Sequence, residues 1–412
     1  MNKKWYISAY QDKITKLVDN FFTRMPAIPF EERARISGIR ESISYLNTAG
    51  IGPCPKPILQ AVMDFQSLLA EIGCLSGEGL AYYQLVPGLL KHIIAPIIGC
   101  EGKDIAFFSN SSQAINVVLQ GMEFSQRDVI LTSDQEHPSG FLPLKRLSEK
   151  HNLRVYFIPY RKPAGFIKHF RSIYDLTKNQ VKLVFLSQAS YKNGAVLPIK
   201  EVAGIIDHTH TKLFVDSAQY AGLQPLQVRD MDVDFLCFPG HKWWYGPLGT
   251  ALLYINPRCL QTLTPAWICY NNVIEPDIDG PIHYQPDGSR FECGTYDISR
   301  FLGLALAMRM IHLWREDITP FYAKTFSLLQ EMLGQRQDLR VMGNPRFSNQ
   351  GIVSFSAKHK LPFIIEQEAY REHNVVLKAI NYPEKPPAVR ISPNLFFGID
   401  PIKRLQKCIA AI

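Results

Sequence analysis

The sequence contains cysteines but lacks the arrangements in which cysteines usually carry out chemistry. Eight cysteines are spread over 412 residues, and no two of them form a Cys-x-x-Cys pair. No group of histidines and cysteines has the spacing of zinc ligands. We therefore expect reduced thiols that mostly fill cores, no metal site, and a cytoplasmic location.

Long apolar segments are also absent. No uncharged apolar run reaches the roughly 18 residues that a membrane-spanning helix needs, so we expect no membrane association. The first ten residues contain lysines that no continuous apolar segment follows. We therefore expect no cleavable signal peptide.

Charge is mixed along the chain and shows no concentrated basic surface. The 45 basic and 37 acidic residues leave a net charge of +8, which favours anionic small molecules mildly. No basic stripe is interleaved with aromatic residues, as nucleic-acid binding would require. We expect no nucleic-acid partner.

The apolar pattern predicts an α/β fold. Short apolar strands alternate with amphipathic helices, which indicates a mainly parallel sheet of seven strands with helices on both faces. A long helix at 301–314 leads into a smaller α+β C-terminal domain with strands at 351–355 and 388–392. We expect a helical segment at 1–45 with a break at 25–29, a large domain at 46–275, the linking helix and small domain at 276–412, and a loop at 382–387. The remaining predicted strands are 105–108, 129–132, 155–158, 181–187, 213–216, 235–238 and 250–255, and the remaining predicted helices are 112–122, 142–151 and 199–208.

The polar residues that stand out follow these strands, where parallel sheets bind ligands. Asp216 ends one apolar strand, and Lys242 follows another among glycines and aromatic residues. Each alone has an ordinary explanation, since Asp often caps helices and Lys is usually a solvated surface charge. Together they suit an aldehyde cofactor with a pyridine ring, because the carboxylate can keep the ring nitrogen protonated and the amine can form an imine.

Two further segments fit the same ligand. The run 109–114 lies between a strand and a helix, so backbone N–H groups and the hydroxyls of Ser111 and Ser112 can bind a phosphate there, with Gln113 beside them. A simple helix cap explains the same run. Arg390 lies between apolar strand residues and a Ser-Pro break, and its planar guanidinium suits an α-carboxylate better than a surface role.

Over residues 45–400 these motifs resemble the fold-type I pyridoxal phosphate (PLP) enzymes of the class V aminotransferase and cysteine desulfurase group. The resemblance implies the PLP-transferase fold and a PLP cofactor held by Lys242, with Asp216 at the pyridine nitrogen. It also places His137 on the face of the ring, Gln219 beside the phenolic oxygen, and His241 near the phosphate.

The resemblance also implies residues for the substrate and for a second subunit. Arg390 matches the carboxylate-binding arginine of an amino acid substrate, and Asn47 lies in the segment that enters the site. Thr295 matches a residue that reaches the phosphate in the partner subunit, which implies a homodimer.

Three departures from the family pattern shape the expected reaction. The segment 375–388 lacks the nucleophilic cysteine that desulfurases carry there, which argues against persulfide formation on the enzyme. Pro239 replaces a phosphate-binding serine. Tyr191 stands where desulfurases often have asparagine and where the lyase and epimerase branch has aromatic residues.

We therefore expect a PLP-dependent lyase that acts on an α-amino acid by β-elimination, possibly with carbon–sulfur cleavage. Its catalytic residues would be Lys242 as general base, Asp216 and His137. An aminotransferase, an amino-acid epimerase and a non-catalytic scaffold with a PLP fold are the alternatives.

Overall fold

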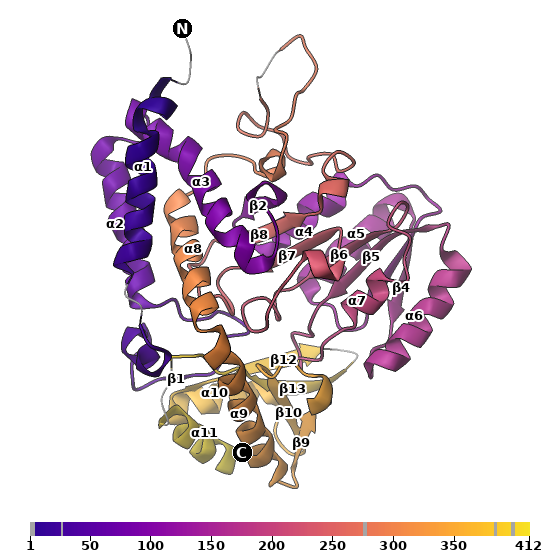
Figure 1. Ribbon diagram of the computed structural model, residues 1–412. Coiled ribbons are helices and arrows are strands. Elements are labelled where there is room, and N and C mark those ends of the chain that lie inside the picture. The colour runs from indigo at the N-terminus through magenta and orange to yellow at the C-terminus, as the bar shows by residue number, and fades with distance from the viewer. Residues whose placement is uncertain (1–4, 26–27, 275–277, 383–384, 397–399) are drawn as a thin grey trace.

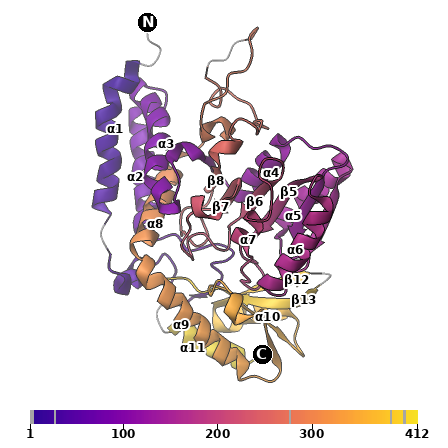
Figure 2. The same ribbon diagram turned by 45° about the vertical axis from the view of Figure 1, so that its right-hand side comes forward.

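The computed structural model describes residues 5–25, 28–274, 278–382, 385–396 and 400–412. Figure 1 shows a large α/β part above a smaller part built mainly from the chain after residue 314. Helix α1 (Trp5–Arg24) runs beside α2 (Lys56–Ile72) and α3 (Gly77–Ile98) at one side of the large part, and Figure 2 shows the same grouping.

Seven of the described strands form the central sheet, in the order β2-β8-β7-β6-β5-β3-β4. The five strands from β7 to β4 are parallel to one another, whereas β8 is antiparallel to both β7 and β2. The mainly parallel, seven-stranded sheet expected from the sequence is confirmed. The strands are β2 (Ile105–Phe108), β3 (Val129–Ser133), β4 (Arg154–Ile158), β5 (Val181–Ser187), β6 (Lys212–Asp216), β7 (Phe235–Pro239) and β8 (Ala251–Ile255).

Both faces of the inner strands are buried, which explains why these strands are largely apolar, whereas the edge strand β4 is mostly exposed or half-buried. In β5, Val184 and Leu186 join one core cluster, while Leu183 and Phe185 join the other. Helices α4 and α5 cover the second face, and α3, α6, α7 and α8 cover the first. Their bounds are α4 (Ser111–Gly121), α5 (Pro138–His151), α6 (Pro163–Thr177), α7 (Ile199–Ala203) and α8 (Ile298–Leu313).

The smaller part packs helices on a four-stranded antiparallel sheet of order β12-β13-β10-β9. A short parallel pair, β1 (Ser44–Tyr45) with β11 (Val375–Val376), ties an N-terminal segment to it. The other elements are α9 (Arg315–Gly334), β9 (Leu339–Met342), β10 (Val353–Ala357), α10 (Pro362–His373), β12 (Lys378–Tyr382), β13 (Lys385–Ile391) and α11 (Asp400–Ala410).

Several local predictions need correction. The loop predicted at 382–387 is mostly strand, because β12 ends at Tyr382 and β13 begins at Lys385; residues 383–384 lie outside the described part. Pro386 and Pro387 fit in β13 because β10 pairs with β13 only from Val389 onward, and the ladder with β12 is irregular near Tyr382. Helix α7 ends at Ala203, five residues before the predicted end, with Gly204 as the residue that follows it.

Six of the described helices were not predicted at all: α2, α3, α6, α9, α10 and α11. Helix α3 contains two internal prolines, which hide its pattern, although Ser76 caps its N-terminus by accepting a hydrogen bond from Gly79 N–H. Helix α1 ends at Arg24, so the predicted break begins there, and residues 26–27 of it lie outside the described part.

No described helix combines the length and apolar character needed to cross a membrane. No cluster of three or more His, Cys, Asp or Glu side chains suited to a metal ion occurs among the same residues.

A buried ion pair joins α3 to the segment that follows the large sheet. Lys91 Nζ lies 2.6 Å from Glu292 Oε1, and both side chains are less than a tenth exposed. The same carboxylate accepts hydrogen bonds from the backbone N–H of Phe107 and the hydroxyl of Tyr296. Glu292 thus anchors a segment three residues before Thr295.

We expect Lys91→Met to lower the free energy of unfolding by about 3 kcal/mol, because it leaves a buried carboxylate without its cation. Denaturant titration monitored by circular dichroism measures this. Lys103→Met is the matched control, since Lys103 pairs with Glu101 at an exposed site and its loss should not be measurable. Equal midpoints for the two variants would contradict a stabilising role for the buried pair.

Candidate active site

A cavity of about 590 Å³ opens at the carboxyl ends of the parallel strands, where the large part meets β12 and β13 of the smaller part. We call it the lysine cavity. Its lining comes from loops after β2, β3, β5, β6 and β7, which all end at this edge of the sheet. Nine of the twelve predicted site residues line it: Ser111, Ser112, His137, Tyr191, Asp216, Gln219, His241, Lys242 and Arg390.

Asp216 and Lys242 lie in the lysine cavity as predicted. Asp216 is the last residue of β6, and its Oδ1 accepts a hydrogen bond of 2.9 Å from Ala218 N–H. Burial raises the pKa of Asp216, and the positive charge of Lys242 opposes that rise. Burial lowers the pKa of Lys242 to about 8, although Asp216 acts to raise it. Each charge therefore supports the other in a site that otherwise disfavours both.

The loop that carries Lys242 is held by close backbone packing. Gly52 donates its N–H to the carbonyl of His241 at 2.7 Å, and the carbonyl of Lys242 leaves no room for a Cβ at Gly52. Nδ1 of His241 is buried with no hydrogen-bond partner among the described residues. Burial lowers the pKa of His241 to about 4, so this ring is neutral near pH 7 and can accept or donate a hydrogen bond.

At the N-terminus of α4, one residue caps the helix and two others face the cavity. Asn110 caps the helix by accepting the N–H of Gln113 at 2.9 Å, so Ser111 and Ser112 are not needed as caps and line the cavity. Gln113 does not line it; its Oε1 accepts a hydrogen bond from Ser109 N–H. The cap and the anion-binding interpretations of this run are therefore compatible.

His137 and Tyr191 form an aromatic corner of the cavity. Their ring centroids are 4.7 Å apart at an interplanar angle of 86°. Nδ1 of His137 caps α5 by accepting a hydrogen bond from Ser139 N–H, which leaves the ring proton on Nε2. Burial, with the nearby positive charges of Lys242 and Arg390, lowers the pKa of His137 to about 4. The ring is therefore neutral near pH 7.

Arg390 projects from β13 and is held by two distant segments. Its Nη1 donates to the carbonyl of Tyr191 at 2.9 Å, and its Nη2 donates to Oδ1 of Asn47 at 3.0 Å. Nε of Arg390 is buried without a hydrogen-bond partner among the described atoms. Asn47 itself does not line the cavity; its contact is with Arg390, which does.

Two predicted residues have environments that the sequence did not suggest. Gln219 lines the cavity, but its Nε2 donates to the carbonyl of Ala49 and its Oε1 accepts from Trp243 Nε1. Thr295 lies away from this chain's lysine cavity, where its hydroxyl is 2.7 Å from that of Tyr270. The predicted roles of both residues stay predictions.

The sequence interpretation missed two other residues near the site. Glu136 is fully enclosed, and its carboxyl accepts hydrogen bonds from the hydroxyl of Ser133 and from the N–H and hydroxyl of Ser187. Burial raises the pKa of Glu136 to about 7. Lys378 lines the cavity from β12, opposite Arg390 in the strand register. The position of Glu136 directly before the predicted site residue His137 could have identified it from the sequence. The residues around Lys378 in the sequence gave no indication that it lies at the site.

Comparison with known families agrees with this geometry. The model of the family described as aminotransferase class-V matches residues 44–376. The chain belongs to the class-V aminotransferase family. The family expected from the sequence motifs is thus confirmed.

Several proteins resemble this family member over most of their length. A probable cysteine desulfurase of Methanothermobacter thermautotrophicus (strain Delta H) is 28% identical over 326 residues, 77% of this chain and 79% of that protein. The apo cysteine desulfurase of Thermococcus onnurineus NA1 superimposes with a TM-score of 0.81 at 22% identity, covering 92% of this chain and 97% of the other. The cystine C-S lyase C-DES, solved with its reaction product cysteine persulfide, gives 0.80 at 24% identity, covering 89% and 97%. These structures share the fold of this class-V chain.

The lowered pKa of Lys242 predicts how this class-V protein takes up an aldehyde. Only the neutral amine attacks a carbonyl, so incorporation of PLP into cofactor-free protein should speed up with pH and level off above about pH 8, not above 10.5. Asp216→Asn removes the charge that raises the pKa of Lys242, so its midpoint should move to lower pH. Stopped-flow absorbance measures uptake, and borohydride reduction with peptide mapping locates the label. A pH midpoint of PLP uptake near 10, or label on another lysine, would contradict the assignment of Lys242 as the lysine that binds PLP.

Proposed function

We propose that this chain is a PLP-dependent lyase that removes the β-substituent of an α-amino acid and cleaves a carbon–sulfur bond in doing so. One observation carries the choice of reaction: the lysine cavity brings together Lys242, Asp216 and Arg390, and no cysteine is among its described lining residues. The site thus has groups for an amino acid and a cofactor, but no thiol to accept sulfur.

The residues present fit PLP. The cavity volume of about 590 Å³ is in the usual range for cofactor sites. Asp216 offers a buried carboxylate to the pyridine nitrogen, and Ser111 and Ser112 offer hydroxyls and N–H groups to the phosphate at the start of an 11-residue helix. The unpartnered Nδ1 of His241 supplies one more polar contact. When bound, PLP supplies an electron-accepting ring that stabilises negative charge at the substrate Cα.

The protein's own groups can then hold the substrate and move its protons. A guanidinium has five N–H donors, and Arg390 is seen to use one on Nη1 and one on Nη2, so donors remain for an α-carboxylate. With a pKa of about 8, the Nζ of Lys242 is partly neutral near pH 7 and suits removal of the Cα proton. The neutral His137 ring, with its proton on Nε2, suits stacking and hydrogen bonding rather than charge repulsion.

The positions of the cysteines favour elimination over desulfuration through an enzyme persulfide. Cys237 is adjacent to Asp216 in the sheet register, but it is buried and its pKa is raised well above the usual value by burial. Cys74 and Cys293 are the exposed thiols among the described residues, and neither lines the lysine cavity. The named relatives include both cysteine desulfurases and a cystine C-S lyase, and the missing thiol brings this chain nearer to the second chemistry.

With cysteine, cystine and cysteine sulfoxides as substrates, we expect pyruvate, ammonia and a sulfur product, with little alanine. The reason is that elimination breaks the Cβ–S bond without a thiol acceptor. Quantifying pyruvate against alanine tests this. Thiol alkylation is the control, because alkylated enzyme should keep its pyruvate yield.

Two results would overturn the lyase proposal. Stoichiometric alanine that disappears on alkylation would identify a nucleophilic cysteine, with the exposed Cys293 the first to test by Cys293→Ser. Amino-group exchange with keto acids, or racemisation, without turnover of any sulfur substrate would favour the aminotransferase or epimerase alternative.

We also infer a homodimer in which Thr295 reaches the phosphate site in the partner's lysine cavity. Thr295 lies outside this chain's own cavity, and the neighbouring segment projects from the large part in Figures 1 and 2. That segment exposes an unusual set of large apolar side chains, which suits an interface: Trp267, Ile268, Tyr270, Ile274, Ile278 and Ile282. The cytoplasmic location stays a prediction.

Mixing two inactive variants tests the shared site. Lys242→Ala and Thr295→Asp should each be inactive alone, and subunit exchange between them should restore activity, because each hybrid dimer contains one site with both native residues. Wild-type mixed with Lys242→Ala is the control for exchange. Failure to recover activity, while sedimentation shows hybrid dimers, would contradict the placement of Thr295.

A further inference from the structure

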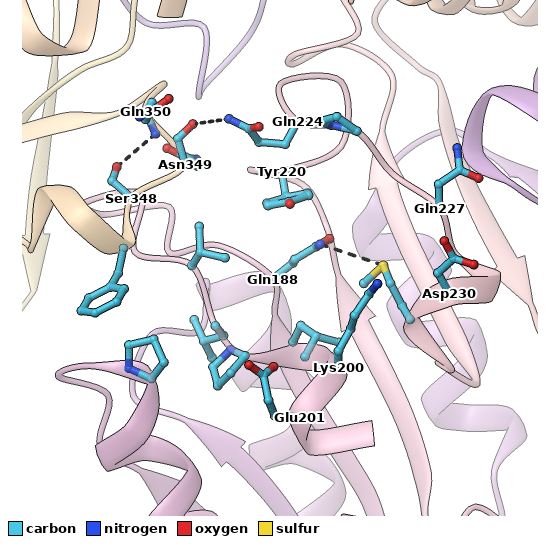
Figure 3. A pocket seen from close by; sticks show the side chains of 18 of the residues that line it. Gln188, Lys200, Glu201, Tyr220, Gln224, Gln227, Asp230, Ser348, Asn349 and Gln350 are labelled. Atoms are coloured by element: carbon cyan, nitrogen blue, oxygen red, sulfur yellow. Dashed lines mark hydrogen bonds between the residues drawn. The ribbon is translucent and has the colours of Figure 1, made fainter. Parts of the chain in front are cut away.

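A second cavity, of about 710 Å³, lies in the seam between the large and smaller parts (Figure 3). We call it the seam cavity. Its walls come from residues 196–201 and 220–231 of the large part and from residues 346–350 of the smaller part. It has no lining residue in common with the lysine cavity. The two cavities are therefore distinct sites.

A buried amide at the seam cavity lacks a good acceptor. Gln188 is 6% exposed, and its Oε1 accepts the hydroxyl hydrogen of Ser217 at 2.5 Å. Its Nε2 donates toward the sulfur of Met231 at 4.0 Å, and a thioether is a weak acceptor. Figure 3 shows the Gln188 and Lys200 side chains extending toward the same region, with Tyr220 beside them. A ligand oxygen placed there would satisfy the Gln188 amide.

Charges of both signs line the same cavity without neutralising one another. Lys200 and Arg346 contribute positive charge, and Glu201 and Asp230 contribute negative charge. None of the four has a partner within salt-bridge distance among the described ion pairs. The remaining wall includes apolar side chains, among them Pro163, Pro198, Ile199 and Phe347. The cavity thus complements a small zwitterion that carries an apolar group.

We propose that the seam cavity binds a free α-amino acid with an apolar side chain and that this ligand modulates the lysine cavity. The carboxylate lies with Lys200 and the Gln188 amide, and the ammonium group with Glu201 or Asp230. Pro198, Ile199 and Phe347 take the side chain.

Hydrogen bonds connect residues at the seam cavity to residues next to the reactive groups, so a bound ligand can affect those groups. Gln188 holds Ser217, the residue after Asp216. Asn349, at the seam, donates its Nδ2 to the carbonyl of Gln219 at 2.7 Å, and its own carbonyl accepts from Gln224. A ligand that shifts the smaller part against the large part therefore changes the surroundings of Asp216 and Gln219. This effector role does not depend on which reaction the lysine cavity performs.

L-Leucine is a suitable probe, because it carries no β leaving group. We expect calorimetry on the PLP-loaded protein to show saturable binding of L-leucine, and Lys200→Glu to weaken that binding about tenfold or more. Arg346→Glu should weaken it in the same direction. Lys145→Glu is the matched control, since Lys145 is exposed on α5 away from both cavities and should leave the affinity unchanged. Binding of L-leucine in the lysine cavity changes the absorbance of PLP and should be lost in Arg390→Ala, whereas the binding that Lys200→Glu weakens should be unchanged in Arg390→Ala, which separates the two cavities.

Two analogues and one kinetic measurement complete the test. 4-Methylpentanoate lacks the ammonium group and isopentylamine lacks the carboxylate, so both should bind at least about tenfold more weakly than L-leucine. L-Leucine should alter the KM or kcat of the wild type without competing with substrate, and this effect should vanish in Lys200→Glu.

The seam proposal fails if L-leucine does not bind, if Lys200→Glu and Lys145→Glu bind it equally, or if Arg390→Ala abolishes the binding that is sensitive to Lys200→Glu. Equal binding of 4-methylpentanoate would remove the zwitterion assignment. Purely competitive inhibition would remove the effector role. Absence of any turnover, with L-leucine binding intact and sensitive to Lys200→Glu, would instead refute the proposed lyase function alone.

Discussion

The electrostatic balance between Asp216 and Lys242 is the constraint on which the rest of the site depends. Burial disfavours both charges, and each charge offsets part of the penalty for the other. Their placement follows from the sheet, because β6 and β7 are adjacent and parallel, so a residue at the end of one lies near the loop after the other. Strand β8 returns antiparallel to β7, and the chain that connects them carries Lys242 across this edge.

The second constraint is that the smaller part contributes Arg390 to the lysine cavity, together with residues 378–380 of β12. Arg390 stands on β13, and it is fixed by Asn47 and by the carbonyl of Tyr191, which precede it by hundreds of residues. Ser392 adds a backbone link to the same entry segment, since its carbonyl accepts the N–H of Thr48. Any movement between the two parts therefore moves the group that would bind a carboxylate, relative to the amine that would act on it.

Much of the fold and the centre of the site were predictable from local sequence. Every strand of the large sheet was located, and most of them are continuous apolar runs because they are buried on both faces; the edge strand β4 is the exception. Asp216, Lys242 and the serines before α4 were identified by their chemistry and by their place at strand ends. Helices α2, α3, α6, α9, α10 and α11 were not located. In α3, apolar residues occur around much of the helix and two prolines break the expected pattern.

The sequence by itself determined the apolar strands, the identity of the reactive side chains, and the lack of a cysteine between residues 375 and 388. These are properties of residue type and short-range order. Only the tertiary structure decided that Asn47 supports Arg390, that Glu136 is enclosed by two serines, and that a second cavity lies beside Gln188. Each of these depends on contacts between segments far apart in the chain. Such contacts arise from packing, which no local pattern of residues encodes.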